Sequence, residues 1–189
     1  MVCHQHPRAT RHKPEQGAVA IEFAALFVLF FALFYGVLAY SVPFFLTLSY
    51  KHLSAEAARS AIRVDPALSR PDYVQAISQQ VTETIGRFWE KLPDDWIDGG
   101  CSAPNDNLPW QPLPPVGGWP SFGHLAAEEI IPGNARYLLH VCIQRRYGSG
   151  SGARERAIVP IVVLGPLTIP SLPTTDGETV LRASTITAL

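Results

Sequence analysis

Charged side chains are missing from one long part of this 189-residue chain, the 28 residues from Phe23 to Tyr50. Catalytic motifs are missing as well. The chain contains no Gly-x-Ser-x-Gly, no His-Glu-x-x-His, no phosphate-binding Gly-x-x-x-x-Gly-Lys loop and no Gly-x-Gly-x-x-Gly after a strand. These absences argue against hydrolases, zinc proteases and nucleotide-binding enzymes, so we expect a protein without catalysis and without a cofactor.

A basic surface for nucleic acid is lacking too, because the formal net charge is only −1. Beyond the first residues the histidines (His52, His124 and His140) are scattered along the chain. No second cysteine or histidine stands at ligand spacing from Cys101 or Cys142, so we predict no metal site.

The uncharged segment is long enough for a membrane helix. At about 1.5 Å per residue its 28 residues make about 40 Å of helix, more than the roughly 30 Å hydrocarbon core of a bilayer. The sequence therefore predicts one membrane-spanning helix that continues a turn or two beyond the bilayer.

The flanking charges predict the orientation of this helix. Three basic residues against one acidic residue precede it: Arg8, Arg11, Lys13 and Glu15. By the positive-inside rule, residues 1–17 lie in the cytoplasm and the C-terminal part lies outside.

A cleavable secretory signal is the alternative for this segment. Such a signal has an apolar core of about 7–15 residues followed by a small-x-small cleavage site. The apolar core here is about twice as long, and the nearest candidate site, Ala39-Tyr40-Ser41, is followed by Pro43 and more apolar sequence.

Glu22 stands at the entrance of the apolar segment. A carboxylate in a membrane helix is unfavourable by about 2.5–3.5 kcal/mol at mid-membrane and by less near the interface, so it marks a functional site. The alternative is a glutamate that is merely solvated at the headgroup boundary.

The residues around Glu22 resemble the class III signal of type IV pilin-like proteins. A basic leader ends at Gly17, and the fifth residue after it is glutamate, followed by Phe23 and a long apolar helix. The Glu-Phe pair is similar to minor pseudopilins of the tight-adherence (Tad) pilus, the TadE-like family. Residues 53–63 are similar to the Ala-Ala-Arg-Glu-Gly-Ala-Arg segment after the membrane helix in that family, with departures at Ser60, Ala61 and Ile62.

This resemblance, which covers residues 15–64, implies a function in pilus assembly and surface adherence. It implies cleavage between Gly17 and Ala18 by a prepilin peptidase, and an assembly role for Glu22 and Phe23. The Glu22 carboxylate would pair with the Ala18 α-amino group of a neighbouring subunit. Implied partners are the peptidase, other pilins and pseudopilins, the inner-membrane assembly platform and membrane lipid.

The location implied by the resemblance is the bacterial inner membrane, crossed once, with the C-terminus in the periplasm and incorporation into a surface pilus. A second hypothesis is a periplasmic binding or enzymatic domain for which the helix is only an anchor. The sequence does not distinguish a shaft component from a tip or an assembly factor.

Beyond the apolar segment the sequence predicts an α+β fold. The first helix should continue to Arg63 and end at Asp65-Pro66, and a second should start near Pro71-Asp72. Residues 136–147 and 153–164 predict a hairpin around the glycine-rich turn 148–152, and residues 178–189 predict a third antiparallel strand. Adjacent Glu128 and Glu129 suggest a solvated helix.

Three parts follow from these predictions. They are a cleaved leader (1–17), a transmembrane and assembly helix (18–64) and an extracytoplasmic α+β domain (65–189). The last part contains a loop rich in proline and tryptophan over residues 93–120, which we expect its tryptophans to pin to the domain.

The cysteines divide by compartment. Cys3 lies in the leader, whereas Cys101 and Cys142 both lie on the oxidising side, where a pair indicates a disulfide. This bridge would join the loop to the strand at 136–147. Two free buried thiols are the alternative.

Overall fold

The computed structural model describes residues 16–91, 96–99, 101–131, 134–147, 158–160, 162–164, 167–169, 172, 174–175 and 178–189. The predicted leader up to Glu15 and the predicted turn at 148–152 lie outside these residues. The chain divides into two units, residues 1–38 and 39–189, and each is described by itself.

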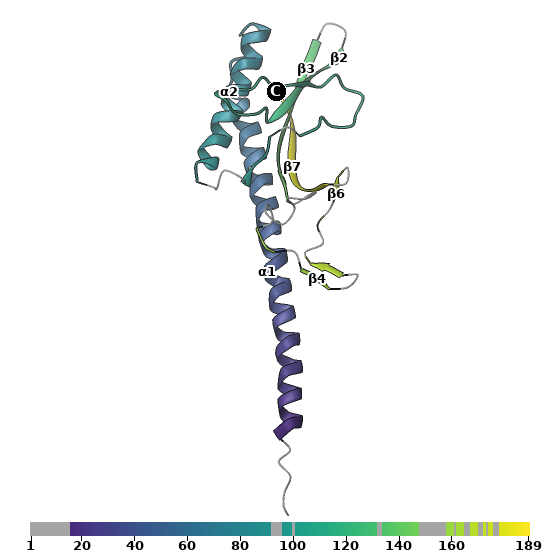
Figure 1. Cartoon of the computed structure of the whole chain (residues 1–189). Helices are drawn as coiled ribbons and strands as arrows, with labels where there is room; N and C mark the ends of the chain where they lie inside the picture. Colours follow the sequence, from purple (N-terminus) through teal and green to yellow (C-terminus); the bar gives the residue numbers. More distant parts are fainter. Residues whose placement is uncertain are drawn as a thin grey trace, which may run out of the picture. The chain divides into compact units, whose positions relative to one another are not determined.

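The described elements are two helices and seven short or long strands (Figure 1). In chain order they are α1 (Gln16–Ala61), α2 (Arg70–Trp89), β1 (Gln111–Pro112), β2 (Gly123–Ile131), β3 (Asn134–Arg146), β4 (Val162–Leu164), β5 (Leu167–Ile169), β6 (Thr174–Thr175) and β7 (Glu178–Ala188). The predicted α+β class is confirmed. The domain boundaries after residues 17 and 64 stay predictions.

The first unit is described from Gln16, and its described residues are helical. Its large apolar side chains are open to the surroundings, among them Phe23, Phe27 and Phe31, whose neighbouring ring centroids are 6.3 Å apart. By length and composition, Val19–Ala61 is able to cross a membrane, as the sequence predicted.

In the second unit, α1 supplies one side of the hydrophobic core. Its buried residues recur on one face: Ala39, Leu46, Tyr50, Leu53, Ala57, Ala58 and Ala61. The alanines allow close approach of neighbouring elements, and the Ser60 and Thr84 hydroxyls, on α1 and α2, lie 3.1 Å apart. On another side, the Ser54 hydroxyl lies 3.0 Å from that of Thr185 on β7. The C-terminal part of α1 therefore packs against both α2 and the sheet.

The helix α2 has the apolar stripe that the sequence predicted. Pro71 stands in its first turn, where a missing backbone N–H leaves no hydrogen bond unmade. Tyr73, Ile77, Val81 and Ile85 are buried at helical spacing. This stripe packs into the same core cluster as α1.

The main sheet is antiparallel in the order β1-β2-β3-β7-β6, and β4 and β5 form a separate pair. Its central strand is β3, in which Leu139, Val141 and Ile143 are fully buried. The predicted strands at 136–147 and 178–189 correspond to β3 and β7, which pair directly.

The predicted hairpin between residues 136–147 and 153–164 is wrong. Residues 134–141 of β3 pair with β2 on one edge and residues 138–146 pair with β7 on the other. The described end of the 153–164 segment forms β4, which pairs with β5. The sequence missed β2 because its Ala-Ala-Glu-Glu stretch favours helix, and pairing along β3 outweighs that local preference. Glu128 and Glu129 thus lie on a strand, and Glu128 forms an ion pair with Arg136.

The described part of the loop at 93–120 is held by its aromatic side chains. Gly117 and Gly118 have φ of +60° and +82°, a left-handed pair that turns the chain tightly. The turn brings Trp119 onto Trp89 of α2, with ring centroids 4.9 Å apart at 73°. The prediction that tryptophans pin this loop is confirmed there.

Candidate functional site

The predicted cleavage site lies at the start of α1. Gly17 and Ala18 are the second and third residues of this helix. Backbone N–H groups in the first turn have no partner within the helix, so exposing the Gly17–Ala18 peptide bond breaks few hydrogen bonds. The structure does not test cleavage, which stays a prediction.

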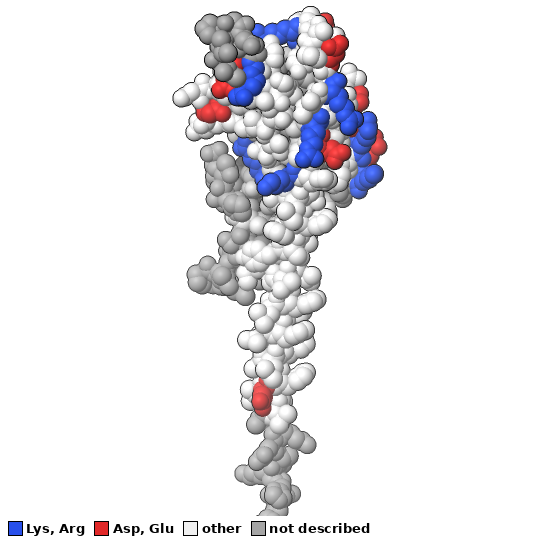
Figure 2. Space-filling view, turned by 180° about the vertical axis from the view of Figure 1, so that it is seen from behind, with Lys and Arg blue, Asp and Glu red and all other residues white. Residues whose placement is uncertain are grey.

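Glu22 lies one turn further along, in an apolar and exposed surface. Its neighbours Val19, Ile21, Phe23 and Leu26 have 66%, 73%, 70% and 61% of their surface exposed. Glu22 takes part in no ion pair among the described residues. Figure 2 shows this surface as uncharged apart from one acidic side chain. If this surface lies in a membrane or between helices, we expect the carboxylate to attract a cation from outside the chain, because an apolar medium strengthens the attraction.

The TadE-like family model matches residues 17–59. This match contains Gly17, Ala18, Glu22 and Phe23, and it confirms the resemblance drawn from the sequence. No curated protein and no solved structure matches the chain. We call residues 17–59 the TadE-like segment.

The TadE-like segment has two kinds of surface. Up to Leu38 its large apolar side chains are exposed, whereas from Ala39 onward one face is buried in the second unit. Ala57 and Ala58, in the part similar to the Ala-Ala-Arg stretch of the family, are 0% and 1% exposed. The small residues of that stretch therefore have a packing role, while Arg59 remains exposed.

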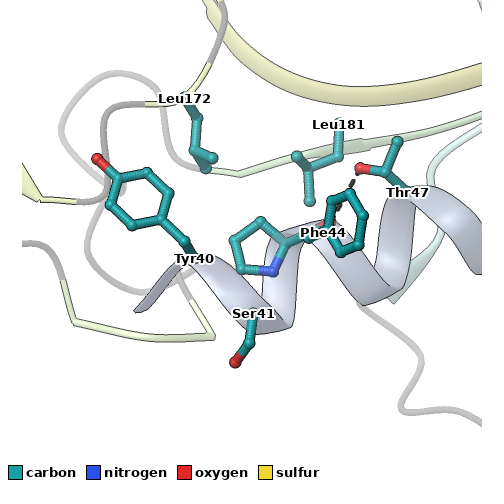
Figure 3. A pocket seen from close by; sticks show the side chains of 7 residues that line it. Tyr40, Ser41, Phe44, Thr47, Leu172 and Leu181 are labelled. Atoms are coloured by element: carbon teal, nitrogen blue, oxygen red, sulfur yellow. Dashed lines mark hydrogen bonds between the residues drawn. The ribbon is translucent and has the colours of Figure 1, made fainter. Parts of the chain in front are cut away.

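An apolar pocket of about 450 Å³ lies beside the TadE-like segment in the second unit (Figure 3). Tyr40, Phe44, Leu172 and Leu181 line it, together with Ser41, Pro43 and Thr47. The Thr47 hydroxyl donates a 2.9 Å hydrogen bond to the carbonyl of Pro43. None of the described residues that line this pocket is an acid, a base or a cation.

The sheet brings together two histidines that are scattered in the sequence. His124 on β2 faces His140 on β3, with 3.4 Å between their Nδ1 atoms. The strands approach closely because Gly123 has no side chain; a Cβ there would lie 2.1 Å from the carbonyl oxygen of His140. Recognising β2 from the sequence would have revealed this pair.

The surroundings of His140 disfavour its charged form. The residue is 1% exposed, and its ring meets Trp110 edge-on at 5.9 Å. Burial, and then the positive charges of His124 and Arg182, lower the pKa of His140 to about 4, while Asp106 opposes this shift. The pKa of His124 is lowered as well, by burial and by Arg182.

Metal-binding geometry does not accompany the histidine pair. Across the part of the chain that the structure describes, no group of three or more histidine, cysteine, aspartate or glutamate side chains could hold a metal ion. Because His140 is buried and its charged form is disfavoured, we expect protonation of this pair to destabilise the fold.

The structure joins Cys101 to Cys142 on β3 as a disulfide, with Cα atoms 6.0 Å apart. Arg182 of β7 contacts both ends of this bridge region. Its guanidinium donates a 2.7 Å hydrogen bond to the Ser102 carbonyl, and its Nε lies 3.2 Å from the Cys142 sulfur. The loop at Cys101 is thus fixed to the centre of the sheet. That the bridge forms in the cell stays a prediction.

We predict that acid destabilises the second unit through His140. Its pKa is lower in the folded state than the ordinary value of about 6.5, so between pH 6.5 and about 4 the unfolded chain binds more protons. The free energy of unfolding should therefore fall as pH falls through this range. Thermal melts from pH 7.5 to 4 should show a shallower decline for His140→Gln than for wild type. Parallel declines for the two proteins would contradict this role.

We predict that Cys101 and Cys142 are bridged in the protein isolated from cells. Alkylation before reduction, followed by mass spectrometry, should give a linked peptide pair and no alkylated Cys101 or Cys142. The bridge closes a loop with a sequence separation of 41, which the loop-entropy account values at roughly 4 kcal/mol. Cys142→Ser should lower the melting temperature on the order of 10 °C, and Cys101→Ser should match it. Two alkylatable thiols in the unreduced protein would refute the bridge.

Proposed function

We propose that this protein is a minor pseudopilin of a Tad-type pilus, cleaved after Gly17 by a prepilin peptidase and acting in pilus assembly and surface adherence. The TadE-like match supports association with a Tad pilus, and we infer a structural role from it. The apolar helix, which is able to span a membrane, fits membrane anchoring. We place the N-terminus in the cytoplasm and the rest of the chain in the periplasm, following the charges that flank the helix.

The observation that carries the proposal is Glu22 on the exposed apolar part of the TadE-like segment. After cleavage, the α-amino group of Ala18 becomes a cation one helical turn from this carboxylate. In a bundle of such helices the carboxylate of one subunit pairs with the amine of another, which neutralises both charges in apolar surroundings and sets the register between subunits. Phe23 and the following phenylalanines supply apolar contact area beside the pair.

Processing, assembly and membrane anchoring each imply a partner. The peptidase acts on the Gly17–Ala18 bond, other pilins and pseudopilins contact the exposed apolar surface, and the inner-membrane platform moves the assembled subunits. Membrane lipid surrounds the same apolar surface before assembly. If the helix were only an anchor for a periplasmic binding or enzymatic domain, Glu22 would be dispensable.

We predict that Glu22→Gln inserts in the membrane and is cleaved normally but fails to assemble. Removing a charge makes insertion easier, but it leaves the Ala18 amine of a neighbouring subunit without its partner. An unpaired buried charge is unfavourable by about 3–5 kcal/mol, which reduces assembly by about two to four orders of magnitude. Co-purification of tagged protein with pilus components measures the loss.

Glu83→Gln is the matched control for this experiment. It makes the same change of charge on α2, outside the TadE-like segment, where Glu83 is exposed. This control should assemble like wild type. Normal piliation and adherence in a strain that carries only Glu22→Gln would contradict the assembly role of Glu22.

A further inference from the structure

Arg182 of β7 holds its positive charge against the sulfur of Cys142 on β3. Its Nε lies 3.2 Å from that sulfur, within hydrogen-bond distance for a nitrogen donor. Two further bonds fix the guanidinium, which donates from Nη1 to the Ser102 hydroxyl at 3.1 Å and from Nη2 to the Ser102 carbonyl at 2.7 Å. The guanidinium is always charged, so the Cys142 sulfur has a permanent cation beside it.

This cation stabilises an open bridge more than a closed one. The sulfur of a disulfide is neutral and only a weak hydrogen-bond acceptor. A thiolate gains much more, because a neighbouring arginine lowers the free energy of the charged form of cysteine. His124 and His140 do not take over this role near neutral pH, since burial lowers the pKa of both and keeps them uncharged. Arg182 therefore favours the state in which Cys142 is a thiolate.

The two sulfurs of the bridge differ in access. Cys101 is 8% exposed, whereas Cys142 is 0% exposed in the central strand. A thiolate from outside the chain therefore reaches Cys101 first. In thiol–disulfide exchange the sulfur that is not attacked leaves as a thiolate, and a more stable thiolate leaves faster. The more accessible sulfur and the stabilised leaving group thus belong to different cysteines, as exchange requires.

Contacts on either side of Cys101 hold the loop independently of the bridge. Before it, the Asp98 backbone N–H donates a 2.7 Å hydrogen bond to the Gln144 carbonyl on β3. After it, Ser102 accepts the two bonds from Arg182. Both ties remain when the sulfur–sulfur bond breaks. The two thiols should therefore stay close together, so that the bridge can close again without refolding.

We propose that Cys101 and Cys142 form an exchange site for a partner that carries a dithiol, with Cys101 as the attacked sulfur and Cys142 as the leaving thiolate that Arg182 stabilises. This inference goes beyond the proposed pilus function and does not depend on it. Its consequence is a bridge that opens and closes within the folded second unit.

The exchange balances in two steps. A thiolate of the partner attacks the Cys101 sulfur and forms a mixed disulfide, while the bond to Cys142 breaks and its electron pair leaves on Cys142. The partner's second thiol loses its proton to solvent and attacks the partner sulfur of the mixed disulfide, which releases Cys101 to take up a proton. The partner's dithiol is thereby oxidised by two electrons to a disulfide, and the bridge is reduced. In the reverse direction Cys142 is the attacking thiolate.

The test measures reduction of the purified full-length protein by dithiothreitol, in a Cys3→Ser background so that the leader adds no thiol. Arg182→Gln should be reduced about fivefold more slowly than wild type, because the leaving thiolate loses its cation. The sign separates this role from a structural one. If Arg182 only held the loop, its loss would expose Cys101 and make reduction faster. Arg182→Lys, which keeps a cation, should recover part of the rate.

Arg136→Gln is the matched control. It removes one arginine from the same sheet, where Arg136 forms an ion pair with Glu128, and it should be reduced at the wild-type rate.

Single-cysteine variants test the two roles separately. In Cys101→Ser, Cys142 should show the ultraviolet absorbance of a thiolate at neutral pH, and adding Arg182→Gln should remove it. An aromatic disulfide reagent should modify Cys101 in Cys142→Ser faster than it modifies Cys142 in Cys101→Ser, because Cys142 is the more deeply buried.

Four results would overturn the exchange site. They are reduction of Arg182→Gln at the wild-type rate or faster, equal slowing by Arg136→Gln, thiolate absorbance that survives the loss of Arg182, and faster modification of Cys142 than of Cys101. None of these measurements depends on cleavage or on assembly in cells. A protein that is cleaved and assembles but gives any of these results overturns this inference alone, whereas one that exchanges as expected but is never cleaved overturns the proposed function alone.

Discussion

Burial of one face of α1 is the interaction on which the second unit depends. Tyr50, Leu53, Ala57 and Ala61 bring this helix into the core, where α2 and the sheet pack against it. Removing water from such side chains stabilises the fold by roughly 25 cal/mol for each Å² of apolar surface. The same helix carries the uncovered apolar residues before Leu38. The fold and the proposed membrane anchor therefore share one element.

This sharing explains the pattern of small residues in the TadE-like segment. A helix that only spanned a membrane would not require the small residues Ala57 and Ala58, which lie after its apolar part. Both residues are buried in the core of the second unit, and on either side of them the hydroxyls of Ser54 and Ser60 contact those of Thr185 on β7 and Thr84 on α2. The match to residues 17–59 thus includes both the proposed assembly surface and the helix around which the second unit folds.

Long elements with a clear period were predictable from the sequence, and pairing between strands was not. The uncharged run and the stripe from Ile77 to Ile85 predicted both helices, because each pattern repeats over several turns. The strand β2 was missed because Ala126 to Glu129 favour helix locally, and its strand form depends on pairing with β3. The contact between His124 and His140 was missed for the same reason, since it exists only in that register.

The candidate sites also differ in how far they could be predicted from the sequence. Gly17 and Glu22 could be singled out because their spacing within one helix is visible in the sequence. The pocket at Tyr40 and Leu181 could not, because it requires β7 to lie beside a particular turn of α1. Packing of elements that are distant in the chain creates such sites, and a single sequence does not specify that packing by periodicity alone.

N-terminal sequencing of the protein extracted from cell membranes tests whether this chain is processed as a pseudopilin. We expect the mature chain to start at Ala18 and Gly17→Val to leave the full precursor, because glycine alone brings no side chain to the bond to be cut. An uncut Met1 would indicate a simple membrane anchor. A start near residue 42 would indicate a secreted domain, and either result would contradict the assignment as a pseudopilin.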